Sequence, residues 1–360
     1  MSFLVIIIAV AVSGGFRAAI RDGVAQMTGD IRITPYTGGG TEPVSMPLHL
    51  PSEAAIRAIP GLDQIQPAAV RAGIVKAGDI VHGVVVKGIP GRDSTLTVSI
   101  PQRLSEITGL GVGEKMTVYF VGEQTRVRRF TITEVHRDIL EMDDNLLVYA
   151  GLPDIQRLNG WAEDEVSCLD IRMKNASRKA AEEAAGQIGM LLHGSASDVE
   201  RGLYVSASSQ TYPQVFDWLD LLDFNVLVIL ILMTVVAGFN MVSGLLIMLL
   251  RNIPLIGTLK TMGMTDRAVG RLFLEVGARA VLKGMLAGNL LAFLFCLVQG
   301  TTHLIRLDPA NYFVSWVPVH LSFWHILGAD AAAFLGILLL LWIPTRMVAG
   351  IDPAQTVKAD

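Results

Sequence analysis

The feature that constrains this chain most is a long run without any charged residue, Phe224–Leu250. A helix needs about 20 mostly apolar residues to cross the roughly 30 Å of bilayer hydrocarbon. Only Asn225, Thr234, Asn240 and Ser243 interrupt the run with polar side chains. It predicts a transmembrane helix, so the chain is expected to be an α-helical membrane protein.

Two further apolar runs predict spans, Gly284–Val298 and Ile326–Ile343. The second holds one acidic residue, Asp330, which we expect near the membrane interface because it lies close to the start of the run. Trp324 and Trp342 lie at its two ends, as the aromatic belt of a membrane helix would.

The N-terminal run, Phe3–Val12, is shorter than a span, because at 1.5 Å per residue it covers only about 15 Å. A signal peptide is the alternative, since Ala9-Val10-Ala11 resembles a cleavage site, but nothing basic precedes the run. We interpret it as the outer half of a truncated first transmembrane helix.

The basic residues of the short loops predict the orientation. The segment 251–283 is rich in them, whereas the loop 301–325 has only Arg306, opposite Asp308. We therefore place 251–283 in the cytoplasm, together with the tail, and residues 14–220 outside. The basic residues of the first segment are Arg251, Lys260, Arg267, Arg271, Arg279 and Lys283.

Residues 14–220 predict a large α+β domain inserted between the first and second spans. Its predicted strands include Ile80–Val86, which is rich in β-branched residues, and the alternating Cys168–Met173. Ser177 is a predicted cap for a helix whose alanines would lie on one buried face.

The whole chain divides into eight predicted segments. They are a truncated first helix (1–13), the α+β domain (14–220), the second helix (221–250), a cytoplasmic coupling segment with the entry to the third helix (251–283), the third helix (284–300), an external loop (301–325), the fourth helix (326–343) and a cytoplasmic tail (344–360).

No catalytic, nucleotide, cofactor or metal site is predicted. Gly109–Lys115 superficially resembles a phosphate loop, but Glu114 and Met116 stand where a glycine and a Ser or Thr are needed. We interpret it as a turn leading into the strand Lys115–Phe120. The acidic group Glu141–Asp144 lacks the spacing of an EF-hand, and the net charge of −4 argues against nucleic acid.

The informative stretch is the predicted short helix 254–263, which would begin with Asn252 as a cap and end at Gly263. A short, partly apolar helix at the membrane face is suited to a groove on a partner protein. The alternative is a basic loop that lies on lipid headgroups. The coupling candidates are Pro254, Leu255, Ile256, Gly257, Thr258, Leu259, Lys260, Thr261, Met262 and Gly263.

Three residues are predicted to pack between transmembrane helices: Asn240, Gly284 and Gly288. The two glycines have the spacing that lets helices approach closely. A polar Asn240 in the middle of a span is costly unless it hydrogen-bonds across helices or lines a polar cavity. We favour packing between helices over contact with a substrate.

These segments resemble the FtsX/MacB-type ABC transporter permeases, most closely the lipoprotein-releasing LolC/LolE type. Ile256–Met264 resembles the signature that follows the family's second span, although Leu255 stands where many members have an acidic residue. Ile343–Arg346 with Ile351–Ala354 resembles the closing signature. The resemblance to the lipoprotein-releasing branch of this family rests on two further pairs of segments. They are Leu307–Tyr312 with Val317–Val319, and Val112–Lys115 with Asp154–Leu158.

The resemblance implies a mechanism. Two permeases, identical or paralogous, would join two copies of a separate cytoplasmic ATPase, which binds ATP and Mg²⁺. ATP-driven closure would push the 254–263 helices, and the spans would carry the movement to a periplasmic domain. A lipoprotein would then leave the inner membrane for a periplasmic carrier. This chain would be no enzyme and would need no cofactor.

Two other functions fit the same resemblance. One is a MacB-like exporter of drugs, toxins or peptides, and the other is a division-type regulator of a cell-wall hydrolase.

Overall fold

The computed structural model describes residues 1–36, 43–92, 95–120, 122, 125–137, 146–174, 177–308 and 312–347. The helices are α1 Ser2–Thr28, α2 Glu53–Arg57, α3 Gln102–Thr108, α4 Leu152–Asn159, α5 Arg178–His193, α6 Asp198–Arg201, α7 Ser208–Thr211, α8 Pro213–Arg251, α9 Ile253–Thr261, α10 Asp266–Thr302 and α12 Phe323–Met347. The strands are β1 Ile31–Pro35, β2 Met46–Pro47, β3 Leu62–Ala77, β4 Ile80–Ile89, β5 Thr97–Pro101, β6 Lys115–Phe120, β7 Arg126–His136, β8 Leu147–Gly151, β9 Glu165–Val166, β10 Cys168–Met173 and β11 Leu203–Ala207.

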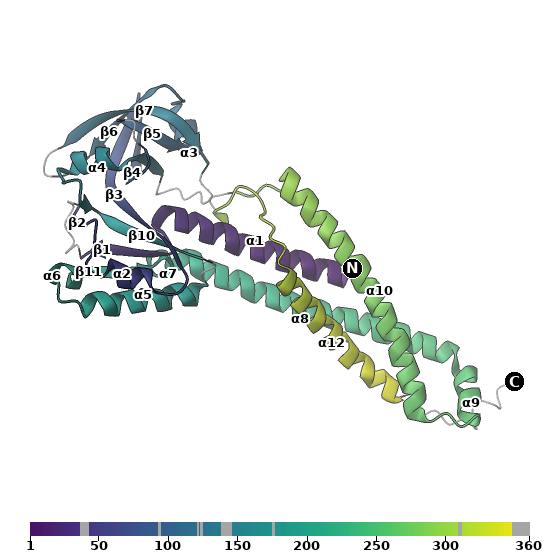
Figure 1. Cartoon of the computed structure of the whole chain (residues 1–360). Coiled ribbons are helices and arrows are strands. Elements are labelled where there is room, and N and C mark those ends of the chain that lie inside the picture. Colours follow the sequence, from purple (N-terminus) through teal and green to yellow (C-terminus); the bar gives the residue numbers. More distant parts are fainter. Residues whose placement is uncertain are drawn as a thin grey trace. The chain divides into compact units, whose positions relative to one another are not determined.

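Four helices are long and apolar enough to cross a membrane: α1, α8, α10 and residues Phe323–Trp342 of α12 (Figure 1). The helices α8, α10 and α12 contain the three longer predicted spans. The prediction of a half-length first helix is wrong, because α1 has 27 residues and covers about 40 Å at 1.5 Å per residue.

Gly14 and Gly15 do not end α1, and a close backbone contact explains their presence. A Cβ on Gly15 would lie 2.2 Å from Pro318 O, and the His320 N–H donates to Ala11 O at 3.0 Å. The segment before α12 therefore crosses α1 where side chains are smallest. The predicted boundary between residues 13 and 14 falls inside this helix.

The chain forms two compact units. One contains Met1–Ala18, Trp218–Arg306 and Trp316–Asp360, and the other contains Ala19–Asp217 with Leu307–Ser315. The helices α1 and α8 run through the boundary without a break. The inserted domain therefore begins and ends within helices, a few residues away from the predicted limits 14 and 220.

Within the helical unit, Arg17 pairs with Asp223 of α8, and Ser13 Oγ donates to the same carboxylate at 2.7 Å. Phe16 and Trp218 pack edge to face with centroids 5.5 Å apart. These contacts tie α1 to α8.

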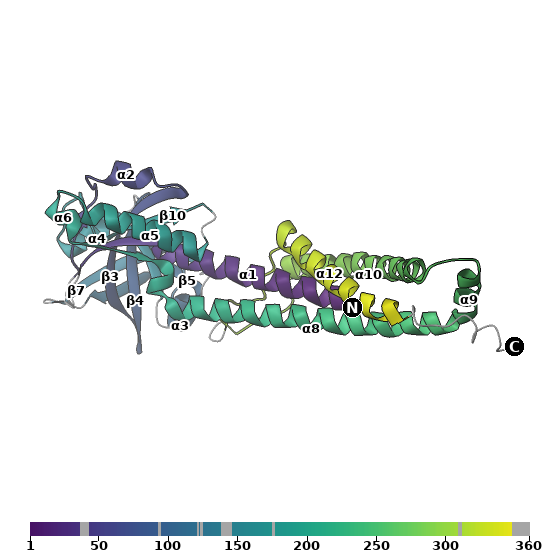
Figure 2. The same cartoon turned by 90° about the horizontal axis from the view of Figure 1, so that it is seen from below.

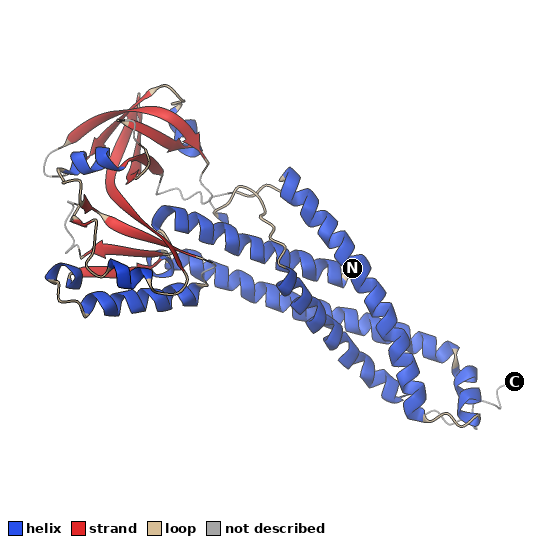
Figure 3. Ribbon diagram, viewed as in Figure 1, coloured by secondary structure: helices blue, strands red, loops and turns tan. Residues whose placement is uncertain are grey.

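The inserted domain is built on a nine-stranded sheet that is partly closed on itself (Figure 3). The 16-residue strand β3 belongs to both parts of it. Its first half extends the antiparallel order β11-β1-β10-β3, and its second half pairs with β4 and also with β6. The strands β3, β4, β8, β5, β7 and β6 therefore form a closed ring, so the predicted α+β description omitted a barrel-like part.

The interior of the ring is apolar and contains two aromatic rings in edge contact. Phe120 and Phe130 have centroids 6.4 Å apart and are almost fully buried. The other fully buried residues of the ring include Val75, Val86, Val98, Ile100, Met116, Val118, Ile132 and Val148.

Local predictions in this domain agree with the structure. The predicted strand Cys168–Met173 is β10, and Lys115–Phe120 is β6. Ser177 Oγ accepts from Ala180 N at 3.2 Å and caps α5. Residues 109–113 lie between a helix, α3, and a strand, β6, whereas a phosphate loop leads from a strand into a helix. The acidic group 141–144 lies outside the described residues.

The end of α1 is set by Gly29, whose φ of 71° favours glycine. A Cβ there would lie 2.8 Å from Ile171 O and 2.9 Å from Ile171 N on β10. We expect Gly29→Ala to lower the free energy of unfolding by about 1–3 kcal/mol, since strain and a backbone clash combine.

Gly78→Ala is the matched control for this prediction. Gly78 also has a positive φ, 59°, but a Cβ there meets nothing within 4 Å. Thermal unfolding of the purified full chain measures both variants. If both variants lost the same free energy of unfolding, the contact between Gly29 and β10 would contribute nothing to stability.

Candidate functional site

The predicted coupling segment forms α9, and both of its ends follow from the sequence (Figure 2). Pro254 lies in the first turn, where its missing N–H removes no hydrogen bond. At the other end Gly263 has a φ of 92°. Its N–H donates to Lys260 O, and the Met264 N–H donates to Leu259 O, both at 3.0 Å. These two bonds form a Schellman motif, which ends the helix.

The helix α9 has one buried side and one exposed side. Ile256 is 1% exposed and belongs to an apolar cluster with Leu249 of α8 and Val269 of α10. On the other side, Leu255 and Met262 are 55% and 80% exposed. A separation of seven residues brings these two side chains to the same side of a helix. We call the following exposed residues the outward face of α9: Pro254, Leu255, Thr258, Thr261 and Met262.

The corner between α9 and α10 is held by a charged pair and a helix cap. Lys260 Nζ lies 2.7 Å from Asp266 Oδ1, and the Lys260 side chain is only 8% exposed. Thr265 Oγ1 accepts from Ala268 N at 3.4 Å at the start of α10. Lys260 therefore stabilises the corner within the chain.

The structure changes two details of the predicted segment. Asn252 makes no side-chain cap for α9, because its Nδ2 donates backwards to Met248 O at 2.7 Å. Gly257 is buried with Ile256, so substitution there would disturb the packing of α9 itself. The large apolar side chains that are exposed on this segment are those of Leu255 and Met262.

The predicted packing residues lie in different surroundings. Gly288 is buried on α10, and a Cβ there would lie 3.0 Å from Phe3 Cβ and 3.2 Å from Leu4 N of α1. Gly284 is exposed, and a Cβ there would meet nothing within 4 Å. The side chain of Asn240 is exposed and has no hydrogen bond to any residue that the structure describes, so its packing role stays a prediction.

Two close contacts between α8 and α12 involve glycines that the sequence analysis missed. A Cβ on Gly238 would lie 2.2 Å from Leu340 Cδ1, and one on Gly336 would lie 2.8 Å from Thr234 Cγ2. Thr234 and Gly238 are four residues apart, which is the small-residue spacing of packed transmembrane helices. That spacing was the signal that could have identified the contact.

The inserted domain contains a second candidate region, a buried network of charges around Asp170 on β10. Arg32 of β1 contacts this carboxylate with two nitrogens, at 2.6 and 3.0 Å. Lys87 Nζ of β4 lies 2.7 Å from Asp170 Oδ2, the oxygen that Arg32 Nη2 also contacts. Burial by itself would raise the pKa of Asp170, but the two neighbouring cations hold the pKa below its usual 3.8. The carboxylate is therefore ionised and paired.

The same two cations bind the last turn of α1. Arg32 Nη2 donates to Met27 O at 3.0 Å, and Lys87 Nζ donates to Met27 O at 2.9 Å. Carbonyls of a helix C-terminus lack partners within the helix and carry its partial negative charge. We call Arg32, Lys87 and Asp170 the α1 clamp. It connects the end of α1 to three strands of the sheet.

The residues just after α1 strengthen this connection. The Asp30 N–H donates to Ile171 O at 2.8 Å, and Asp30 Oδ2 accepts from Met173 N at 2.8 Å. The chain therefore passes from the end of the helix directly onto β10.

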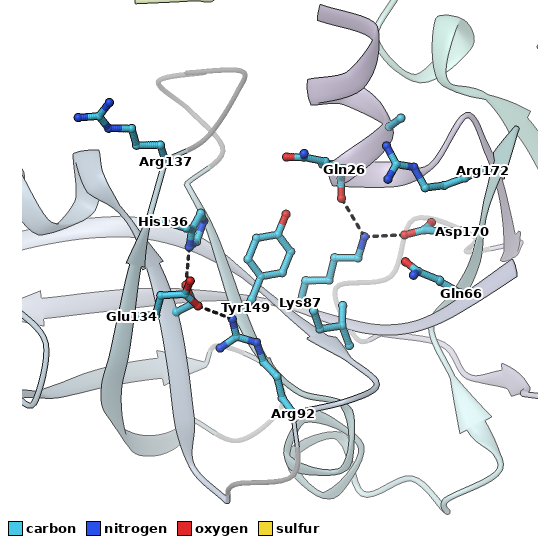
Figure 4. A pocket seen from close by; sticks show the side chains of 13 residues that line it. Gln26, Gln66, Lys87, Arg92, Glu134, His136, Arg137, Tyr149, Asp170 and Arg172 are labelled. Carbon is cyan, nitrogen blue, oxygen red and sulfur yellow. Dashed lines mark hydrogen bonds and ion pairs between the residues drawn. The ribbon is translucent and has the colours of Figure 1, made fainter. Parts of the chain in front are cut away.

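A cavity of about 340 Å³ lies next to the clamp, and Lys87 and Asp170 are among its lining residues (Figure 4). Tyr149, Arg137 and Arg172 are among its lining residues. Several of its polar groups are paired within the protein: Arg92 lies 3.0 Å from Glu134, and His136 Nδ1 lies 2.7 Å from Ser99 Oγ. Across the described ranges no group of three or more His, Cys, Asp or Glu side chains could hold a metal ion.

The clamp and the cavity were not predicted from the sequence. Charged residues are rarely fully buried unless they are paired. Lys87 lies inside the apolar strand β4, and Asp170 lies inside β10. A charged residue within an apolar strand was the signal available in the sequence, but it did not indicate which residue would pair with that charge.

Comparison with known proteins finds similarity to transporter permeases. The family model for the FtsX-like permease C-terminal region matches residues 227–353. The chain is 21% identical to the lipoprotein-releasing system transmembrane protein LolC of Xylella fastidiosa strain 9a5c, over 98% of this chain and 90% of that protein. It is 25% identical to LolE of Haemophilus influenzae, over 45% of this chain and 41% of that protein.

Two solved structures align with about half of the chain. The periplasmic region of MacB from Actinobacillus actinomycetemcomitans is 13% identical over 53% of this chain and 95% of that chain, with a TM-score of 0.33. The extracellular domain of the transporter YknZ from Gram-positive bacteria is 14% identical over 49% of this chain and 98% of that chain, with a TM-score of 0.30. At these scores the overlaps carry no argument about function.

The four long helices fit a membrane permease. The short helix α9, which follows α8, lies within the matched region. Residues 227–353 match the FtsX-like permease C-terminal region, and nearly the whole chain is similar to the lipoprotein-releasing protein LolC at 21% identity.

Proposed function

We propose that this permease releases lipoproteins from the inner membrane and delivers them to a periplasmic carrier. The similarity to LolC over 98% of the chain supports this substrate class. In this proposal the inserted domain lies in the periplasm, and α9 lies in the cytoplasm, as the basic segment 251–283 favours.

ATP hydrolysis takes place on a separate subunit, which contacts the outward face of α9. A short helix with exposed Leu255 and Met262 fits an apolar groove on such a partner. Two permeases, alike or paralogous, complete the transporter.

The observation that carries the proposal is that α1 is one unbroken helix whose last turn is clamped to the sheet of the inserted domain. Movement of α1 in the membrane therefore acts directly on β1, β4 and β10 through the α1 clamp. The permease requires stiff helices and a coupling element for this task, and no catalytic group.

The test uses the complete transporter in proteoliposomes that contain a triacylated lipoprotein. Release into the soluble fraction is expected only when ATP and the carrier are both present. Equal release without nucleotide would contradict the proposal. Drug sensitivity with normal lipoprotein sorting, after loss of the gene, would favour an exporter instead.

A further inference from the structure

The helices α10 and α12 are joined inside the membrane-spanning unit by a polar pair, Asn289 and Asp330. Asn289 Nδ2 donates to Asp330 Oδ2, and Asp330 is only 5% exposed. Asp330 lies about 10 Å along α12 from Phe323, at 1.5 Å per residue. The Asp330 side chain is therefore buried against α10, and its predicted position near the membrane interface stays a prediction.

Among the residues that the structure describes, none forms an ion pair with the Asp330 carboxylate. The first charged residue of α1 is Arg17, α8 has none between Asp223 and Arg251, and α10 has none after Lys283. Up to Trp342 the other titratable residue of α12 is His325, which is exposed and bonded to Ser322 Oγ at 2.8 Å. An unpaired charge is costly in hydrocarbon, and a neutral group is favoured there.

Two buried oxygens point to the same conclusion. Asn289 Oδ1 and Asp330 Oδ1 have no hydrogen-bond partner among the described residues. Both atoms are acceptors while Asp330 is ionised, and buried polar atoms seldom remain unpaired. One proton on the carboxyl group converts Oδ1 into a donor, so that a carboxylic acid faces a carboxamide and each group both donates and accepts.

We propose that Asn289 and Asp330 form a proton-holding site between α10 and α12, in which Asp330 is a neutral carboxylic acid. The ligand is a single proton, and the pair locks the two helices together through reciprocal hydrogen bonds. Movements that separate α10 from α12 must break both bonds. The site requires neither α9 nor a transported substrate, so it stands apart from the proposed function.

Infrared difference spectroscopy of the full chain in lipid nanodiscs at neutral pH tests the site. The spectrum of the unaltered chain minus that of Asp330→Asn is expected to contain the C=O band of a protonated acid, and the band should shift in D₂O. Asn289→Ala should move this band to higher frequency, because the carbonyl oxygen of the acid loses the hydrogen bond that Asn289 Nδ2 donates to it.

Asp223→Asn is the matched control, since Asp223 pairs with Arg17. That difference spectrum should contain carboxylate bands and no acid band. If Asp330→Asn also removes only carboxylate bands, Asp330 is ionised and the proposal is overturned.

A second measurement covers the case in which Asp330→Asn fails to fold. Aspartate labelled with ¹³C at its carboxyl group shifts the acid band of the unaltered chain, and Asp330→Glu should remove the shifted band. A spectrum without a labelled acid band, or one that Asp330→Glu leaves unchanged, would equally overturn the proposal.

Discussion

Replacing Asp170 with Asn is expected to lower the free energy of unfolding by about 3–5 kcal/mol, the cost of removing one partner from a buried ion pair. The change leaves Arg32 and Lys87 without the carboxylate that both contact, at a position where Asp170 is only 3% exposed. It also weakens the hold of both cations on the end of α1, because neither remains oriented by the carboxylate.

The measurement is denaturant or thermal unfolding of the purified full chain, followed by a probe in the inserted domain. Asp63→Asn is the control, since Asp63 is 42% exposed and lies 3.5 Å from Lys174 at the surface. That change is expected to cost no more than about 1 kcal/mol. If the two variants were equally stable, the α1 clamp would not be a stabilising contact.

Leu255→Asp and Met262→Asp are expected to weaken ATPase binding about 30-fold, and to abolish the stimulation of ATP hydrolysis by the permease. A central interface residue is worth about 2 kcal/mol or more, which corresponds to such a factor. The side chains are 55% and 80% exposed, so an aspartate at either position stays hydrated and α9 keeps its fold.

The assay compares ATP hydrolysis by the partner subunit with each permease variant in nanodiscs. Leu304→Asp is the control, because Leu304 is an apolar residue of similar exposure, 75%, after the far end of α10. It should leave hydrolysis and membrane insertion unchanged. Normal ATP hydrolysis in both α9 variants would show that the outward face of α9 does not contact the ATPase. It would favour the alternative in which this face lies on lipid headgroups.

The sequence alone determined the features that depend on short stretches of chain. A charge-free run is sufficient for a span, because the bilayer demands about 20 apolar residues whatever surrounds them. Pro254 and Gly263 define the ends of α9, since a missing N–H and a positive φ are properties of single residues. Alternation predicted β10 for the same reason.

The tertiary structure alone decided the features that join distant parts of the chain. The pairing of β3 with β6 closes a ring, and Arg32, Lys87 and Asp170 meet at the end of α1. Asn289 meets Asp330 across two helices. Periodicity reports which face of an element is apolar, but it does not report which element covers that face. The partner of a buried charge is chosen by the packing of the whole domain, where desolvation makes an unpaired charge untenable.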